Sequence, residues 1–187
     1  MAARTSMASL ITRVRLMVGD TGTAVFTDEQ VQSFLDQHRI DVRYGEMVGE
    51  ETRASGGAVT YLTFWDADRL AFWESDAAIT DHAYNTLTAT TYEYELGRFT
   101  FSTDQTANCP LHLTGKTYDV NAAAADLLDA WASLVAIQFD YADAAVTDSW
   151  QKKQAQLIKM ADRYRSMSRP GHVALVRLDM GDMRVDY

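Results

Sequence analysis

Residues 117–141, TYDVNAAAADLLDAWASLVAIQFDY, are the stretch that indicates the fold. Apolar side chains recur there at the i, i+3, i+4 and i+7 spacing of one helical face, and aspartates lie between them. A helix of about 24 residues would be roughly 36 Å long. A second amphipathic helix is expected to begin at Asp148 or Ser149, after a break at 142–148. So short a break makes the two helices antiparallel neighbours, and we expect this pair to form the core.

The side chains assigned to the core share the apolar period of these two helices or of an earlier one. They are Phe34, Leu35, Leu127, Leu128, Trp131, Leu134, Val135, Phe139, Leu157 and Ile158.

Two shorter helices are expected before this pair. Residues 6–19 have an apolar face that ends at Gly19. In the next segment, FTDEQV, Thr27 and Gln30 have the spacing of a capping box, and Phe26 can pack on Val31. This signal predicts a helix from Asp28 to about Val42.

After residues 44–57, which end in SGG and are interpreted as a flexible crossing, the apolar period changes from 3.6 to 2. Short aromatic and β-branched runs predict strands at 58–65, 70–74, 91–95, 98–102 and 110–113. The expected class is α+β, mainly α: an antiparallel bundle of about four helices, a small inserted antiparallel sheet and an extended C-terminal tail. The expected parts are the N-terminal helices (1–57), the inserted sheet (58–113), the helical hairpin (114–168) and a C-terminal extension (169–187).

Charge is unevenly distributed along the 187 residues, whose net charge is −9. Residues 46–96 carry ten acidic and two basic side chains, whereas 149–169 are strongly basic. An acidic chain is a poor general binder of nucleic acid, because phosphate contacts depend on Lys and Arg. Opposite charges on different parts of one chain suit head-to-tail docking of copies, although two solvated faces of opposite sign explain the charges equally well.

No motif for catalysis, a metal or a cofactor is found, so we expect none of these and no enzyme activity. The four histidines lie far apart in the sequence, and His38 is interpreted as a core histidine. Asp66-Ala67-Asp68 lacks the remaining ligands of a calcium loop. The single Cys109 is expected to be structural and buried. No apolar run is long enough for a transmembrane helix, so no membrane partner is expected.

Residues 172–178, HVALVRL, alternate as a strand does, yet no partner strand is evident in the sequence. A free apolar strand is a liability unless something pairs with it. We therefore expect it to add to a partner's sheet or to be buried at a subunit boundary.

Two groups of motifs resemble a known family. The opening LITRVR, followed by Gly19-Asp20 and by FTDEQV, is similar to the start of tailed-phage head–tail connector (adaptor) proteins. YDVNAAAADLLDAWA at 118–132 and SWQKK at 149–153, with Leu157, Ala161 and Tyr164 after it, are similar to later parts of the same family. The resemblance covers the two ends of the chain, and the sheet between them is larger than the insertion of the simplest members.

The resemblance implies a virion protein of the phage neck. Its subunits, twelve in such adaptors, would form a ring under the portal protein, extend the DNA channel and carry the stopper or tail protein. Duplex DNA would pass through the lumen without sequence-specific binding. No cofactor is implied.

The same resemblance suggests two sets of contact residues. The neighbouring subunit would be met by the bases Lys152, Lys153, Lys159 and Arg163 and by the acids Asp66, Asp68, Glu74 and Asp76. The portal would be met by the C-terminal extension: Arg169, His172, Val173, Leu175, Val176, Arg177, Leu178, Met180, Met183, Val185 and Tyr187. A solvated helix face is the plainer interpretation of the lysines.

Two other functions stay open at this point. A phage stopper or tail-completion protein is the nearest alternative. A small soluble binding or regulatory module, with a ligand or partner on its aromatic sheet, belongs to a different class. A ring with a central hole would distinguish an adaptor from such a module, which would be a monomer or dimer.

Overall fold

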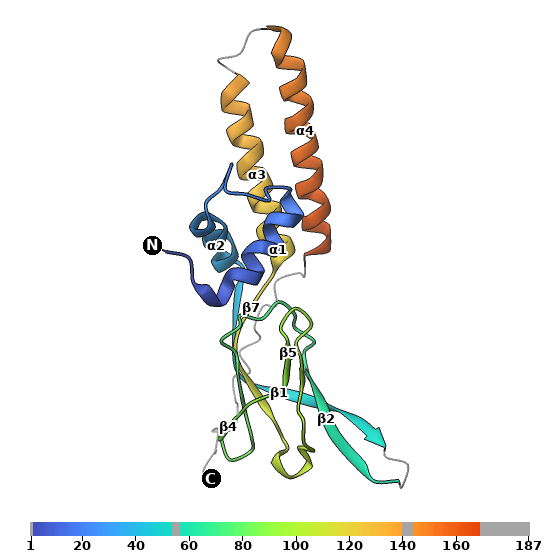
Figure 1. The fold of residues 1–187 in the computed structure, drawn as a ribbon. Helices are drawn as coiled ribbons and strands as arrows, with labels where there is room; N and C mark the ends of the chain where they lie inside the picture. The colour runs from blue at the N-terminus through green and yellow to red at the C-terminus, as the bar shows by residue number, and fades with distance from the viewer. Residues whose placement is uncertain (1, 54–56, 140–143, 169–187) are drawn as a thin grey trace, which may run out of the picture.

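The computed structural model describes residues 2–53, 57–139 and 144–168, and leaves out the side chains of 138–139 and 144–149. Helices gather at one end of the molecule and a curled antiparallel sheet at the other (Figure 1). The sheet has seven strands and the described chain is 41% helical and 28% strand, so the expected mainly helical bundle with a small inserted sheet is wrong.

The helical end contains a short 3-10 turn, η1 (Thr5–Met7), and four helices: α1 (Ala8–Val18), α2 (Asp28–Gln37), α3 (Val120–Phe139) and α4 (Ala144–Met167). Gly19, at φ 80°, ends α1 in the left-handed conformation as expected. The capping box of α2 is confirmed: Thr27 Oγ1 accepts from the Gln30 amide, and Gln30 Oε1 accepts from the Thr27 amide.

Two helix boundaries differ from the prediction. Helix α2 ends at Gln37 rather than near Val42, because the chain enters a strand at Arg39. Helix α4 begins at Ala144, so Asp148 and Ser149 lie inside it and do not cap it. Alanines 144 and 145 extend the helix toward its N-terminus, since alanine is the best helix former.

The sheet has the order β4-β3-β7-β1-β2-β6-β5, and neighbouring strands are antiparallel. Its strands are β1 (Arg39–Arg53), β2 (Val59–Asp66), β3 (Ala78–Thr80), β4 (Thr86–Leu87), β5 (Thr91–Glu93), β6 (Arg98–Thr100) and β7 (His112–Tyr118). The expected strands near 58–65, 91–95 and 98–102 are present, and β5 and β6 form the expected hairpin. Residues 70–74 are not a strand and contribute one bridge, from Trp73 to Thr117.

Strand β1 is the largest departure from the prediction. Residues 44–53 of the segment expected to be a flexible crossing belong to a 15-residue strand, roughly 50 Å long, that pairs with β7 and then with β2. Its glycines allow close packing: a Cβ on Gly49 would lie 2.8 Å from the Tyr61 ring, and one on Gly45 would lie 2.7 Å from Val42. The sheet therefore spans 39–118 and crosses the boundaries expected at 57 and 113.

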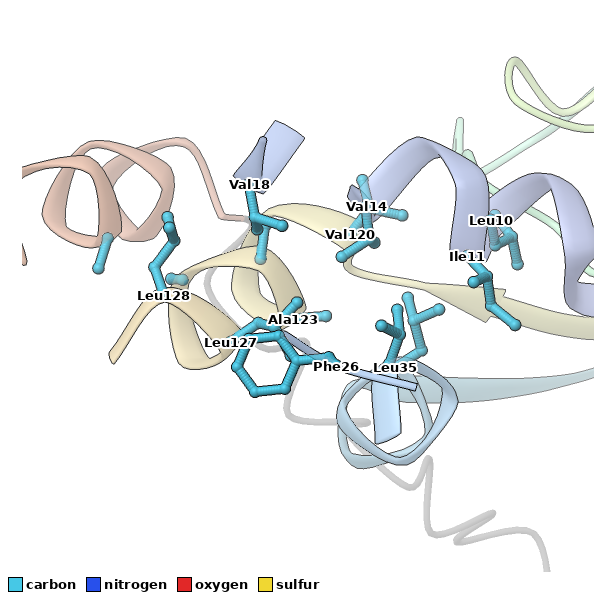
Figure 2. Close-up of a cluster of buried hydrophobic side chains, with 14 of the residues drawn as sticks. Leu10, Ile11, Val14, Val18, Phe26, Leu35, Val120, Ala123, Leu127 and Leu128 are labelled. Atoms are coloured by element: carbon cyan, nitrogen blue, oxygen red, sulfur yellow. The ribbon is translucent and has the colours of Figure 1, made fainter. Parts of the chain in front are cut away.

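The described residues form two hydrophobic clusters, one at each end of the molecule. The helical cluster joins α1, α2 and α3 around residues such as Val14, Leu35, Val120 and Leu127 (Figure 2), and Leu157 and Ala161 of α4 complete it. The sheet cluster surrounds Trp73, Phe64, Phe99, Leu111 and Leu113. Tyr164 of α4 also donates a hydrogen bond to the Met17 carbonyl, which holds α4 against the end of α1.

The residues assigned to the core from the sequence have three outcomes. Leu35, Leu127, Leu128, Val135 and Leu157 are buried, and Phe34 and Trp131 are half-buried against the helical cluster. Leu134 and Ile158 are exposed instead. The side chain of Phe139 lies outside the described residues.

A buried carboxylate connects the helical end to the sheet. Glu74 is fully buried in the segment before β3. Its Oε1 accepts from Arg4 Nε at 3.0 Å and Ser6 Oγ at 2.5 Å, and its Oε2 accepts from Tyr118 Oη at 2.7 Å. The ammonium of Lys116 lies 3.4 Å away. Arg4 also pairs with Asp36 of α2 at 2.6 Å, so this network ties the N-terminus, α2 and β7 together.

These contacts keep Glu74 charged. Burial pushes its pKa up, but the hydrogen bonds from Ser6 and Tyr118 and the charges of Arg4 and Lys116 outweigh burial, so the pKa of Glu74 lies below its ordinary value. Burial and the hydrogen bond to Glu74 raise the pKa of Tyr118, which therefore stays a phenol and a donor.

Replacing Glu74 by glutamine should lower the free energy of unfolding at pH 7 by about 2–4 kcal/mol, because Arg4 and Lys116 lose their buried counter-charge. A lowered carboxylate pKa stabilises the fold above the unfolded pKa, about 4.3, and this stabilisation is lost as pH falls through the folded pKa. The gap in the free energy of unfolding between the wild type and Glu74→Gln should therefore narrow below about pH 4.

Urea unfolding at a series of pH values measures this gap. Glu95→Gln is the matched control, because Glu95 is exposed and should change stability little at any pH. A gap for Glu74→Gln that stays constant from neutral to acid pH would contradict the charged network.

Candidate subunit-interaction surface

The hairpin of α3 and α4 projects beyond the rest of the molecule (Figure 1). Helices α1 and α2 cover the part of α3 nearest the sheet, up to Trp131, whose ring meets Phe26 edge to face at 6.5 Å. Farther along, Figure 1 shows α3 beside α4 alone among the described residues. Each helix of the projecting part therefore has one packed face and a wide face without cover.

Large apolar side chains of both hairpin helices are exposed. Leu134 and Ile137 of α3 are 46% and 61% exposed, and Ile158 of α4 is 43% exposed. Leu134 and Ile158 were expected in the core, and this prediction is wrong. The helical period shows that a face is apolar, but it does not show how many neighbours cover that face. We call these three residues the apolar hairpin face.

A lysine and two tryptophans join the helices of the hairpin. The Lys153 ammonium lies 5.4 Å from the centre of the Trp131 ring and 5.3 Å from that of Trp150. A cation at this distance from an indole face is attracted by the ring electrons. Lys153 therefore has partners within its own chain, and its expected ion pair with a neighbouring subunit stays a prediction.

The other predicted bases form a line on the outer side of α4. Lys152, Lys159 and Arg163 are exposed and have the i, i+7 and i+11 spacing of one helical face. Among the described residues, no carboxylate lies within ion-pair distance of Lys159 or Arg163. We call Lys152, Lys159 and Arg163 the basic stripe.

Two of the four acids predicted for the interface cannot face a partner. Asp66 is buried and accepts a hydrogen bond from the Leu70 amide at 2.7 Å, and Glu74 is buried in its network. Sequence spacing could not show this, because their partners are set by the tertiary fold. Asp68 and Asp76 are exposed, and the Asp76 carboxylate lies 3.9 Å from the Lys116 ammonium.

A hollow of about 600 Å³ lies between the helices and the sheet. Its wall includes His38 and Asp126, joined at 2.7 Å, and Arg165, which pairs with Asp129 and Asp162. Ser168 on its rim donates to Asp119 at 2.8 Å and not to His38, so the described residues of the hollow contain no Ser-His-Asp arrangement.

Cys109 is exposed, and the expectation of a buried cysteine is wrong. Its thiol donates to the Gln105 carbonyl at 3.3 Å. Partial burial of the sulfur and the nearby charge of Asp104 raise the pKa of Cys109, which disfavours the reactive thiolate. Among the described residues, no group of three His, Cys, Asp or Glu side chains could hold a metal ion.

The residues predicted to dock on the portal, from Arg169 to Tyr187, lie outside the described residues.

One helical segment of the described residues, Val120–Ile137, is long and apolar enough to cross a membrane by length and composition, against the expectation from the sequence. Core helices meet the same criterion, and much of this segment packs against α1, α2 and α4.

No family model, curated protein or solved structure gives a significant match to this chain.

Replacing Lys153 by glutamine should lower the free energy of unfolding by about 0.5–1 kcal/mol and shift the tryptophan emission, because both indoles lose their cation. Lys159→Gln is the matched control, since Lys159 lies on the basic stripe. Chemical unfolding followed by fluorescence compares the two variants. Equal effects of the two substitutions would show that the indoles do not hold Lys153.

Proposed function

We propose that the chain is a structural head–tail adaptor of a tailed phage. In this proposal its copies form a ring under the portal, extend the DNA channel and connect the portal to the stopper or tail. The observation that supports it best is the apolar hairpin face, which the described chain exposes and a neighbouring subunit would cover.

The apolar hairpin face favours assembly on physical grounds. Leu134 and Ile137 lie on the projecting part of α3, and Ile158 lies on α4 nearer the sheet. A second copy would remove them from water, and each fully buried aliphatic side chain contributes about 1.5–3 kcal/mol. Exposed apolar patches of this kind mark interaction sites when they are contiguous.

The exposed charges favour a contact between two different surfaces. The basic stripe lies on α4, whereas Asp68 follows β2 and Asp76 precedes β3. Complementary charges on two separate surfaces favour a head-to-tail contact, which produces a ring when the rotation between subunits closes. A symmetric dimer would instead bring the basic stripe against itself if it used that surface.

The acidic balance is compatible with a channel for DNA. The sheet end exposes Glu46, Glu50, Glu51, Asp68 and Asp76, and the net charge of the chain is −9. A wall of negative charge does not hold a passing polyanion, whereas a basic wall would bind its phosphates. No side chain is required for chemistry in such a role.

The double variant Leu134→Glu/Ile137→Glu should weaken self-association by about a hundredfold, because it places two charges in an apolar contact. The monomer should keep its stability, since both residues are exposed in it. Sedimentation velocity over a range of concentrations measures the association, and Gln156→Glu, exposed on α4, is the control. Unchanged association of the double variant would contradict this interface.

The double variant Lys159→Glu/Arg163→Glu tests the charge contact. It should weaken association at low salt and remove most of its salt dependence, because exposed ion pairs are screened by salt. Adding Asp68→Lys/Asp76→Lys to the same chain should restore association, and this rescue would identify the acidic side of the contact. Wild-type association that does not depend on salt, together with unchanged association of these variants, would exclude the charge contact.

A further inference from the structure

Two exposed tyrosines form a pair on the surface of the sheet. Tyr44 of β1 and Tyr84, in the turn between β3 and β4, are 57% and 67% exposed. Their ring centres lie 5.4 Å apart and the ring planes are 84° apart, so the rings meet edge to face. We call these two residues the tyrosine pair.

A bulge in β1 sets the direction of Tyr44. The pairing of β1 with β7 shifts between Val42 and Gly45, and Tyr44 within this bulge has φ 53°. Its amide donates to Thr114 Oγ1 at 3.1 Å. Bulges change the direction of a side chain relative to the pleat of its strand, and they are common next to functional sites.

A second backbone irregularity sets the direction of Tyr84, which has φ 63°. The turn is held by Asp81, whose Oδ1 accepts from the amides of Ala83 and Asn85 at 2.8 Å. The Tyr84 amide itself donates to the Asp81 carbonyl at 3.0 Å. Tyr84 is therefore fixed by the turn before anything contacts its ring.

The strain at both tyrosines calls for an explanation. A bulky residue with positive φ is uncommon, and such a conformation costs about 1–3 kcal/mol. Both rings are exposed among the described residues, so neither fills a hydrophobic core there. Strain of this kind concentrates at functional sites. Rings that are already held in place lose little freedom on binding, and tyrosine is among the residues that contribute most to protein interfaces.

The apolar hairpin face supplies side chains at a spacing that fits the tyrosine pair. Leu134 and Ile137 are three residues apart on α3, and side chains at that spacing have Cβ atoms about 5–6 Å apart. The two ring centres are separated by 5.4 Å. Each aliphatic side chain can therefore lie against one ring.

The charges around these two surfaces are complementary. Residues 41–51 of β1 expose four acidic side chains and one basic side chain. Residues 152–165 of α4 expose five basic side chains and one acidic side chain. The basic end of α4 is close to Leu134, because the Lys153 ammonium lies 5.4 Å from the ring centre of Trp131, one helical turn before it. Opposite charges around an apolar contact favour the correct orientation of two copies.

We propose that the tyrosine pair of one copy binds Leu134 and Ile137 of a neighbouring copy. Each subunit then uses its hairpin on one neighbour and its tyrosine pair on the other, so the contact is head-to-tail. This inference rests on the proposed function, because it names the second surface of the subunit contact.

Replacing both tyrosines by asparagine tests the contact. Tyr44→Asn/Tyr84→Asn removes the rings, and asparagine tolerates positive φ better than most residues, so the monomer should keep its stability. Self-association should weaken at least about tenfold in sedimentation velocity, because the anchors of the contact are lost. Tyr44→Phe/Tyr84→Phe keeps the rings and should associate as the wild type does. Leu96→Asn, at an exposed leucine of the sheet outside the pair, is the control and should also associate normally.

Mixing two defective variants tests whether the two surfaces meet directly. Tyr44→Asn/Tyr84→Asn keeps its hairpin, and Leu134→Glu/Ile137→Glu keeps its tyrosine pair. At a concentration where each variant alone is a monomer, an equimolar mixture should form a one-to-one dimer, since one working contact remains between the two proteins.

The outcomes separate this inference from the proposed function. Wild-type association of the asparagine variant, or a mixture that stays monomeric, would overturn the tyrosine contact and leave the assembly of copies standing. A wild-type chain that stays a monomer at every concentration would overturn both.

Discussion

The arrangement of this molecule depends on the buried carboxylate of Glu74. Its partners come from the N-terminus and β7, with α2 attached through Arg4, so it joins the end that holds the helical cluster to the end that holds the sheet cluster. A buried charge costs several kcal/mol unless it is fully paired. These contacts join the N-terminal segment, α2 and β7 to one buried carboxylate, so the network holds the helical end against the sheet.

That orientation leaves two parts of the chain without cover among the described residues. The α3–α4 hairpin extends away from the helical cluster with Leu134 and Ile137 exposed, and residues 39–42 of β1 pair with β7 on one side alone among the described strands. Both features are costly for an isolated subunit, because apolar surface and unpaired peptide groups favour association. Both features are compatible with the proposed assembly of copies of this chain.

The sequence was sufficient to predict helices and their ends where local signals agree with the fold. The capping box at Thr27, the end of α1 at Gly19 and the long helix after Val120 are examples. It failed at β1, because RIDVRYGEMVGEETR has two glycines, charges on both faces and no continuous apolar alternation. The exposed charges could be predicted in part: the basic stripe follows from spacing, but Glu74 is buried against Ser6, which is 68 residues away in sequence.

The central claim is that copies of this chain cover each other's hairpins in a closed ring. Light scattering behind size exclusion, with negative-stain images of any large species, tests it most directly. The account predicts a closed ring whose central hole, roughly 20 Å or wider, admits duplex DNA. A monomer or a symmetric dimer at every concentration, with the hairpin still exposed to solvent, would contradict the claim and favour a small binding module.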